Sequence, residues 1–303
     1  MKFDYSFFNS YGDNLRGHFW KTAAPIGNVI LVTGMQEHSN RYDEFAQFLN
    51  DHGLDVYCLD HYGQGENVKD GKFGIVPKHT FFKYADTMHE LQLRLESTTE
   101  LPTYVFAHSM GSFIAQAYMQ RHNSVSKKVV LCGTSGKIPF SKIGFKLAKI
   151  KINDDNWNEP SPLFTSLSVG GYAKTIKNRE FECDWISYNR ENRVKYNDDP
   201  MCGYMCSNGF YYNLLEGTSK IFDGKYIKAI NEDVDILVVV GEHDAVSANA
   251  KRAYELIRRY KRNDHHKIHL KVYKNMRHEL LNEDGKADVM KDIVRFFLLD
   301  KVQ

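Results

Sequence analysis

Hydrophobic residues are grouped along the chain into eight short runs that predict β-strands. The first two runs alternate with polar residues and are separated by the turn sequence Tyr-Gly-Asp-Asn at 11–14, a pattern that predicts a β-hairpin. The other six runs are almost continuously apolar, which is typical of strands buried on both faces of a parallel sheet. The predicted strands cover residues 3–9, 15–21, 29–33, 55–59, 103–107, 128–132, 236–240 and 268–273.

Apolar residues at helical spacing lie between and after these strands. Residues 41–52 carry Tyr42, Phe45, Phe48 and Leu49 on one helical face. Strands that alternate with helices predict a doubly wound α/β sheet with right-handed crossovers. Further helices are predicted at residues 82–96, 111–122, 248–262 and 287–299.

One long segment, residues 137–216, interrupts this alternation. It contains no clear buried strand and is rich in aromatic residues, lysine and asparagine. Such a segment is too long for a plain loop in a compact domain. We therefore predict a mostly helical cap at 137–216, inserted into a core formed by residues 1–136 and 217–303.

The overall composition narrows the functional classes. The chain has 303 residues, of which 42% are hydrophobic and 26% are charged, as in an ordinary soluble globular protein. Its net charge of +2 provides no broad basic field, so we expect no nucleic-acid partner. The N-terminus is polar, unlike a secretory signal, and no apolar run reaches the ~18 residues of a membrane span.

The five cysteines indicate the compartment. Their number is odd and their spacing shows no disulfide framework, which favours reduced thiols and a cytoplasmic location. Cys202 and Cys206 stand four residues apart, but no second cysteine or histidine pair lies near them in the sequence to complete a zinc set. We therefore predict neither a bound metal nor an organic cofactor.

The stretch FAHSMGS, residues 106–112, contains the candidate nucleophile, Ser109. It follows a predicted strand, precedes a predicted helix and nearly matches the pattern G-x-S-x-G, with Ala107 in place of the first glycine. A nucleophile on such a sharp turn needs small neighbours two residues away on each side, and Ala107 and Gly111 meet this requirement. A serine hydroxyl also needs a base, a group that orients the base, and donors for the oxyanion.

An acid and a histidine stand where these partners are expected, after two late strands. Asp244 follows the strand at 236–240, and His278 follows the last strand. Glu242 follows the same strand as Asp244 and competes with it for the role of the acid. The order of serine, acid and histidine along the chain is the one that accompanies this turn in α/β-hydrolases.

The oxyanion donors are expected to be main-chain N–H groups. Met110 begins the helix after Ser109, so its amide and the helix dipole face the developing negative charge. The second donor should come from the loop after the third strand, where Gly34 permits a turn. The N–H of Met35 is the candidate for this donor.

Taken together, these segments resemble the monoacylglycerol lipase and lysophospholipase branch of the α/β-hydrolases over almost the whole chain. The resemblance implies an α/β-hydrolase fold, with an eight-stranded, mostly parallel sheet, flanking helices and an inserted helical cap. It also implies a triad of Ser109, Asp244 and His278. Two positions depart from the family pattern, because Thr33 replaces the usual histidine and Gln36 replaces a glycine. The motifs that carry the resemblance are GMQEHSNRY (34–42), DHYGQGEN (60–67), AHSMGS (107–112), GEHDAVS (241–247), RHELLNE (277–283) and the cap sequence DWISYNRENRVKYNDDP (184–200).

The family resemblance implies hydrolysis of carboxylic esters through an acyl-enzyme. It places the acid at Asp244 rather than at Glu242, and it implies a small-molecule ester with a fatty acyl chain, such as a monoacylglycerol or a lysophospholipid. A short-chain or aromatic-acyl carboxylesterase or amidase on the same scaffold is the alternative. A hydrolase-like binding protein without turnover is the third possibility. Thr33 and Gln36 remove no catalytic group, so they bear on the substrate rather than on the chemistry.

Two further sets of polar residues have alternative interpretations. Glu37, His38 and Arg41 either contact the substrate or, as we prefer, brace the oxyanion loop. Asp60 is expected to pin the turn that follows its strand. The first cap helix carries lysines that either meet an anionic lipid surface transiently or form a solvated face. These lysines are Lys142, Lys146, Lys149 and Lys151.

Overall fold

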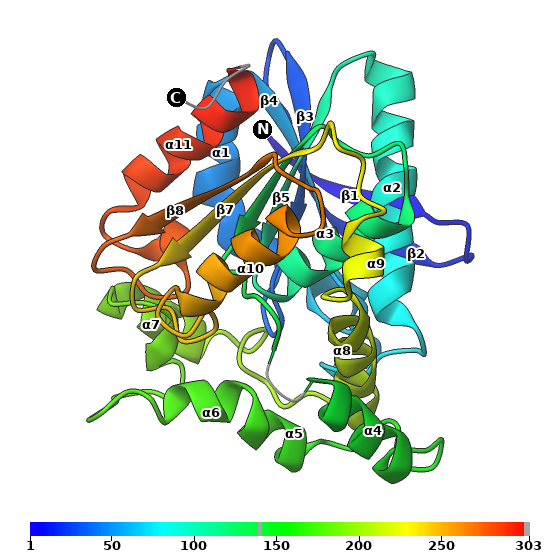
Figure 1. Ribbon diagram of the computed structural model, residues 1–303, viewed down its shortest axis with the longest axis vertical. Coiled ribbons are helices and arrows are strands. Elements are labelled where there is room, and N and C mark those ends of the chain that lie inside the picture. Colours follow the sequence, from blue (N-terminus) through cyan, green and yellow to red (C-terminus); the bar gives the residue numbers. More distant parts are fainter. Residues whose placement is uncertain (139–140, 300–303) are drawn as a thin grey trace.

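Eight strands form a single sheet in the computed structural model, which describes residues 1–138 and 141–299 (Figure 1). Their order across the sheet is β1-β2-β4-β3-β5-β6-β7-β8. All eight predicted strands are present, each beginning and ending within two residues of the prediction. The strands are β1 (Lys2–Phe8), β2 (Asn14–Trp20), β3 (Gly27–Val32), β4 (Leu54–Leu59), β5 (Thr103–His108), β6 (Lys128–Cys132), β7 (Asp235–Gly241) and β8 (Ile268–Tyr273).

The sheet is parallel except at one edge. β1 pairs with β2, and β2 pairs with β4, in antiparallel register, so the predicted N-terminal hairpin is confirmed. The remaining neighbours are parallel; for example, Val32 at the end of β3 lies opposite Ala107 on β5. Parallel strands end at the same edge of a sheet, so the loops that follow β3, β5, β7 and β8 can meet there.

The last strand is less buried than its apolar run predicts. β8 lies at the edge of the sheet. Its Ile268 and Tyr273 are buried, but His269 and Lys271 are exposed. The prediction of burial on both faces is wrong for β8, because an edge strand is not covered along its whole length on both sides.

All five helices predicted outside the cap are present. Helix α10 begins later than predicted, at Lys251 rather than at residue 248. Ala248, Asn249 and Ala250 have left-handed φ angles of 53°, 54° and 64°, so they cannot belong to a right-handed helix. The five helices are α1 (Asp43–Asp51), α2 (Thr80–Thr99), α3 (Met110–Arg121), α10 (Lys251–Lys261) and α11 (Lys286–Leu298).

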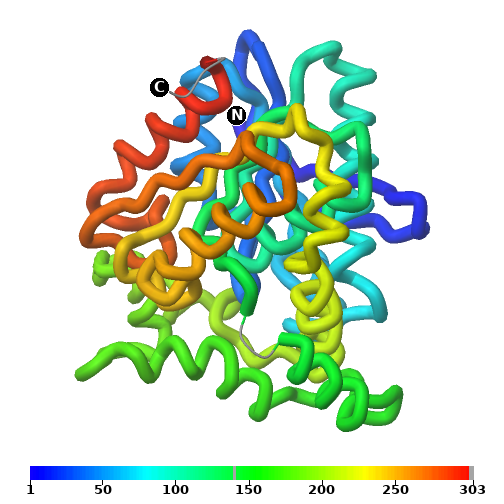
Figure 2. Tube along the Cα trace, viewed as in Figure 1, coloured from blue at the N-terminus to red at the C-terminus, as the bar shows by residue number. Residues whose placement is uncertain are grey.

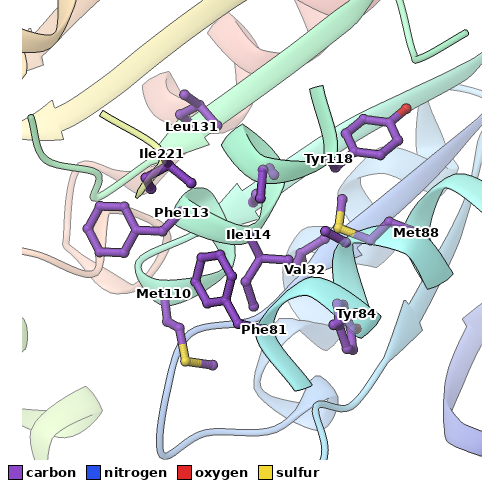
Figure 3. Packing of buried hydrophobic residues seen from close by; sticks show 14 of the residues in the cluster. Val32, Phe81, Tyr84, Met88, Met110, Phe113, Ile114, Tyr118, Leu131 and Ile221 are labelled. Carbon is purple, nitrogen blue, oxygen red and sulfur yellow. The ribbon is translucent and has the colours of Figure 1, made fainter. Parts of the chain in front are cut away.

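Helices cover both faces of the sheet and enclose two hydrophobic cores. On one face, α1 and α11 contribute residues such as Phe45 and Ile293 to a buried cluster with the strands. On the other face, α2, α3 and α10 form a larger cluster with the strands and with the cap. Figure 3 shows Phe113 and Ile114 of α3 in this cluster, beside Phe81 of α2. The turn at Ser109 therefore leads into a helix that is buried from Met110 to Gln120.

The segment between β6 and β7 is helical, as predicted for the cap, and its residues 141–198 lie across one end of the sheet (Figures 1 and 2). We propose the boundary between cap and core at residues 216 and 217, which falls within α8. Residues 139–140 of the proposed cap and 300–303 of the proposed core lie outside the described residues. The helices of this segment are α4 (Ser141–Lys151), α5 (Pro162–Leu167), α6 (Val169–Ala173), α7 (Arg190–Asp198), α8 (Asn208–Lys220) and α9 (Gly224–Ile227).

Short 3-10 helices complete the described chain. None of its helices, over residues 1–138 and 141–299, is long and apolar enough to cross a membrane. The 3-10 helices are η1 (Ser39–Tyr42), η2 (Gly65–Asn67), η3 (Asp184–Ile186) and η4 (Leu280–Asn282).

The close packing of α3 on β3 gives a testable consequence. A Cβ atom at Gly111 would lie 2.5 Å from the carbonyl oxygen of Thr33 and 2.6 Å from that of Val32. Gly111→Ala must therefore separate two backbone segments, and we expect it to destabilise the fold by about 1–3 kcal/mol. The free energy of unfolding in urea measures this effect.

Gly171→Ala is the matched control for this substitution. A Cβ atom at Gly171 of α6 meets nothing nearer than the Ser166 carbonyl oxygen, at 3.6 Å. Alanine there is expected to stabilise the fold by about 0.5–1 kcal/mol, because it restricts the unfolded chain. Equal effects at the two positions would contradict the close approach of α3 to β3.

Candidate active site

Ser109 occupies a sharp turn between β5 and α3. Its φ and ψ angles are 51° and −120°, a conformation that residues other than glycine rarely adopt. Its backbone N–H donates to the carbonyl of Cys132 on β6 at 2.9 Å, and its carbonyl accepts from the N–H of Ser112 at 2.9 Å and from the Ser112 hydroxyl at 2.6 Å. These bonds hold the strained turn and place Ser109 in the wall of a cavity.

The structure brings His278 and Asp244 together with Ser109. Nε2 of His278 lies 2.8 Å from Oγ of Ser109, and Nδ1 of His278 lies 3.0 Å from Oδ1 of Asp244. Asp244 is fully buried, and the same carboxylate oxygen accepts the N–H of Val246 at 2.9 Å. The competing acid, Glu242, instead accepts the N–H of Asn275 at 3.2 Å. The three groups thus form a continuous hydrogen-bonded chain from carboxylate to hydroxyl.

Three neighbours fix the position of the His278 ring. Gly133 has a left-handed φ of 58°, and a Cβ atom there would lie 3.0 Å from Cε1 of the ring. The rings of Trp185 and His108 lie 5.1 Å and 4.8 Å from the His278 ring, measured between centroids. Trp185 comes from the cap, and the sequence analysis did not assign it to the site. The only signal for it was its place in the cap sequence 184–200.

The two predicted oxyanion donors lie beside Ser109. Met35 and Met110 both line the cavity that contains Ser109. Within residues 1–138 and 141–299, neither backbone N–H donates to another backbone carbonyl. Gly34 allows the close approach of the loop, because a Cβ atom there would lie 3.1 Å from Cβ of Ser109 and 2.6 Å from Oε1 of Glu37.

A buried charge cluster holds this loop from behind. Oε1 of Glu37 accepts hydrogen bonds from the N–H of Gly34, from the Tyr42 hydroxyl at 2.8 Å and from Nδ1 of His108 at 3.1 Å. Arg41 donates to Oε2 of Glu37 at 2.9 Å. These contacts agree with the hypothesis that Glu37 and Arg41 brace the oxyanion loop.

Arg41 connects Glu37 to Glu279, the residue next to His278. It makes a bidentate pair with Glu279, at 2.7 and 2.8 Å. No role was predicted for Glu279 from the sequence, although it is the third residue of the motif RHELLNE. The backbone N–H of Glu279 also donates to the carbonyl of Ile186 in the cap at 2.7 Å. One guanidinium therefore links the loop of Met35 to the loop of His278.

The charges in this cluster shift the pKa values of its members. Burial alone would raise the pKa of Glu37, but the hydrogen bond and charge of His108, the charge of Arg41 and the N–H of Gly34 outweigh it and hold this pKa far below its usual value. Burial would likewise lower the pKa of His108, but its bond to Glu37 raises it. Both shifts favour the charged form of the group that they concern.

Cys202 and Cys206, which stand four residues apart, do not belong to one group of potential metal ligands. Cys202 lies near His38 and Asp199, with one potential ligand atom of each within 4.8 Å of the others. His38 is already paired with Asp199, at 2.8 Å between Nε2 and Oδ2. Cys206 does not belong to this group. His38 thus contacts the segment after α7 rather than the Glu37 brace.

The cavity in front of Ser109 has a volume of about 450 Å³. It extends from Ser109 and His278 into the cap, where apolar side chains of α4, α5 and α8 form most of its wall. A cavity of this size and composition suits a small molecule with a substantial apolar part. The apolar wall includes Phe113, Ile138, Leu147, Phe164, Leu167, Tyr211, Leu214 and Leu215.

Fold and site together define the class of the protein. A serine on a strand–turn–helix, a histidine and a buried aspartate in this chain order, on an eight-stranded, mostly parallel sheet, characterise the serine hydrolases with the α/β-hydrolase fold. Residues 23–285 match the family described as "Serine aminopeptidase, S33". Because this match spans most of the chain, the chain belongs to that family of hydrolases.

Individual relatives confirm the fold and the resemblance drawn from the motifs. The chain is 26% identical over 275 residues to a monoacylglycerol lipase of Mycolicibacterium smegmatis, covering 90% of this chain and 89% of the relative. It is 30% identical over 149 residues to lysophospholipase L2 of Escherichia coli, covering 48% of this chain and 41% of the relative. A solved structure of a thermostable carboxyl esterase from Bacillus coagulans, in complex with glycerol, superimposes with a TM-score of 0.89 at 26% identity, covering 98% and 97% of the two chains.

Asp60, at the end of β4, provides a pH-dependent test of the structure around the site. Its carboxylate is 1% exposed and accepts from the N–H of Ser39 at 2.7 Å and from the N–H of Glu66 at 3.0 Å, so it pins the predicted turn. Burial nevertheless raises the pKa of Asp60 from 3.8 to about 6. A raised folded-state pKa means that the contribution of Asp60 to stability is greatest below pH ~4 and is lost as the pH rises through 6.

Replacing Asp60 with asparagine removes this titration. We expect Asp60→Asn to destabilise the fold in acid, and its deficit relative to the wild type to shrink by up to about 3 kcal/mol between pH 4 and pH 7. Unfolding in urea at several pH values measures the difference. Asp70→Asn, on an exposed turn, is the control for the general effect of replacing an aspartate with asparagine. A constant deficit for Asp60→Asn would contradict the raised pKa.

Proposed function

We propose that the chain is a serine ester hydrolase that works through an acyl-enzyme, with Ser109 as nucleophile, His278 as general base and Asp244 as the acid that orients it. The observation that carries the proposal is the hydrogen-bonded chain from Asp244 through His278 to Oγ of Ser109, at 3.0 and 2.8 Å. His278 takes the proton of Ser109 as the oxygen attacks the ester carbonyl, and Asp244 stabilises the resulting imidazolium.

His278 then returns the proton to the leaving alcohol, which completes acylation of Ser109. Water then enters, His278 activates it, and the acyl group leaves Ser109 as a carboxylate. The N–H groups of Met35 and Met110 are proposed to bind the oxyanion in both halves. In comparable sites, one such donor contributes about 2.7–4 kcal/mol of transition-state stabilisation.

The wall of the cavity supports a fatty acyl substrate. Its apolar lining extends from Ser109 to the cap helices α4, α5 and α8, and its polar groups lie near Ser109 and His278. An acyl chain directed into the cap would leave the ester carbonyl at Ser109. We therefore propose a monoacylglycerol or a lysophospholipid as substrate, and the lipases among the relatives support this choice.

A carboxylesterase for short or aromatic acyl groups is the second candidate. The similarity to a carboxyl esterase structure favours it, but a 450 Å³ cavity is larger than an acetyl or butyryl group requires. We also infer a cytoplasmic location from the five cysteines, all of which are unpaired and buried.

Hydrolysis of a chain-length series of nitrophenyl esters tests both the nucleophile and the acyl preference. We expect activity to peak at medium or long acyl chains, because each methylene that enters the apolar cavity adds about 0.8 kcal/mol of transfer free energy. Ser109→Ala should lose at least about 10³-fold in kcat, as other triads do without their nucleophile. A peak at acetate or butyrate would contradict a lipid substrate, but it would still support the triad.

Controls separate the nucleophile from general effects of mutation. Ser166→Ala, at an exposed serine of α5, should keep full activity. A fluorophosphonate label should react with the wild type and with Ser166→Ala but not with Ser109→Ala. Complete absence of labelling in the wild type would instead support the hydrolase-like binding protein.

The cap surface supports contact with anionic membranes as part of this function. Ile143 and Ile150 lie seven residues apart on α4 and are 62% and 83% exposed, and Leu167 of α5 is 68% exposed. Ile143 and Leu167 also line the cavity, so its entrance opens onto this apolar surface. Four lysines of α4, residues 142, 146, 149 and 151, are exposed beside it. This combination suits a basic amphipathic helix on an anionic lipid surface.

Vesicle binding tests this surface. The wild type should co-sediment with phosphatidylserine-containing vesicles more than with pure phosphatidylcholine, and added salt should weaken this binding because the lysine charges are screened. Replacing both Ile143 and Ile150 with serine should reduce binding by about tenfold or more, since two apolar side chains leave the lipid. Leu93→Ser, at a 44% exposed residue of α2, is the control. Equal binding by both variants would contradict the proposal.

A further inference from the structure

Gln36 has an unusual place in the loop that is proposed to bind the oxyanion. It directly follows Met35. Its φ angle is 59°, in the left-handed region that glycine adopts freely. The chain thus keeps the backbone conformation expected of glycine but adds a side chain of five heavy atoms to it. Such strain persists only where the surroundings hold it in place.

Polar contacts surround Gln36, which is 4% exposed. Its N–H donates to Oε1 of Gln64 at 2.8 Å. Its carbonyl accepts from the Tyr196 hydroxyl at 3.1 Å and from the N–H of Gly203 at 3.2 Å. Its side-chain amide donates to the carbonyl of Tyr204. The side chain therefore ties the oxyanion loop to the cap segment that follows α7.

A second cavity lies on the far side of this contact. It has a volume of about 310 Å³ and is lined by residues of the cap, including Glu182, Asn197 and Tyr204. Its wall is less apolar than that of the cavity at Ser109. Residues common to both walls separate the two spaces, and they are Gln36, Val169, Trp185 and Tyr196.

The shared wall stands beside the proposed proton donor to the leaving alcohol. The Trp185 ring lies 5.1 Å from the His278 ring, and His278 would protonate the alcohol oxygen. The alcohol that His278 protonates as it leaves the acyl carbon therefore faces the wall that contains Trp185 and Gln36. Helices α4 and α8 line the first cavity but not the second. We therefore assign the acyl chain to the side of α4 and α8, and the second cavity to the alcohol side of the ester.

We propose that Gln36 is a specificity-determining residue, whose side chain closes the passage between the two cavities and limits the alcohol part of the ester to small polar groups. This inference rests on the proposed ester hydrolysis at Ser109. A glycerol-sized alcohol fits in front of the wall, whereas a head group as large as glycerophosphocholine needs the space behind it. The chain therefore discriminates in favour of monoacylglycerols and against lysophospholipids, by a steric wall and not by a lost contact.

Gln36→Gly isolates the effect of the side chain. Glycine adopts a φ of 59° without strain, and the bonds of the Gln36 N–H and carbonyl do not involve the side chain. Only the contact with Tyr204 and the barrier itself are removed. Asn178→Gly is the matched control, because Asn178 also has a left-handed φ, of 52°, and is exposed on the cap. Thermal unfolding of both variants checks that they fold.

Hydrolysis of two oleoyl esters measures the discrimination. The substrates are monooleoylglycerol and oleoyl-lysophosphatidylcholine, which share the acyl chain and differ in the alcohol. We expect the ratio of their kcat/KM values to fall by about tenfold or more in Gln36→Gly, within the range that one steric change in a pocket produces. It should not change in Asn178→Gly. An unchanged ratio in a folded Gln36→Gly variant would overturn the inference.

Binding without turnover tests the wall independently of catalysis. An ether-linked lysophosphatidylcholine, which cannot be hydrolysed, is titrated below its micelle concentration into Ser109→Ala and into the double variant Ser109→Ala, Gln36→Gly. The double variant should bind it about tenfold more tightly by calorimetry, because the head group then gains the second cavity. Equal affinities would also overturn the inference. Absence of ester hydrolysis with a clear difference in binding would instead contradict only the proposed function.

Discussion

The backbone conformation of Ser109 is the constraint on which the rest of the structure depends. A φ of 51° points its hydroxyl out of the sheet, toward the loops that follow β7 and β8, where His278 meets it. The conformation requires α3 to begin immediately after β5 and to lie against β3. Gly111 permits that approach, because any Cβ atom there would collide with the carbonyl groups of Val32 and Thr33. Hydrogen bonds from the Ser109 N–H to the Cys132 carbonyl, and from Ser112 to the Ser109 carbonyl, secure the turn. A large hydrophobic core around α3 compensates for the strain that this geometry stores.

A second requirement is that loops without regular structure keep their positions to within a fraction of an ångström. The buried ion-pair network meets it. Glu37 holds Gly34 and therefore Met35, while Arg41 joins Glu37 to Glu279, the residue next to His278. Burying three charges is costly, and hydrophobic residues of similar size would often be at least as stable. Charged groups have the advantage of direction, since a bidentate guanidinium fixes the angle between two loops as well as their distance.

The cap connects the site to its substrate in two different ways. Its apolar side chains extend the cavity away from Ser109. Its polar segment after α7 instead contacts the oxyanion loop, through Tyr196, Gly203 and Tyr204 on Gln36. Because the cap holds a loop that is proposed to bind the oxyanion, movement of this segment would change the geometry of the site as well as access to it. We therefore propose that the contacts of this segment with Gln36 couple substrate choice to the geometry of the site.

The sequence determined the local elements, because they depend on neighbours along the chain. Apolar runs and helical spacing located all eight strands and the helices of the core, and strand ends located Ser109, Asp244 and His278, which the fold then brings within hydrogen-bonding distance. Two predictions from the sequence were wrong. β8 is apolar enough for a central strand but lies at the edge of the sheet. Helix α10 begins three residues later than predicted, because residues 248–250 have left-handed φ angles. Only the tertiary structure decided that Glu279 shares Arg41 with Glu37, and that Trp185 and Gln36 lie between two cavities. Arg41 and Glu279, for example, are 238 positions apart in the sequence. Periodicity along a sequence does not predict which distant side chains will pack together.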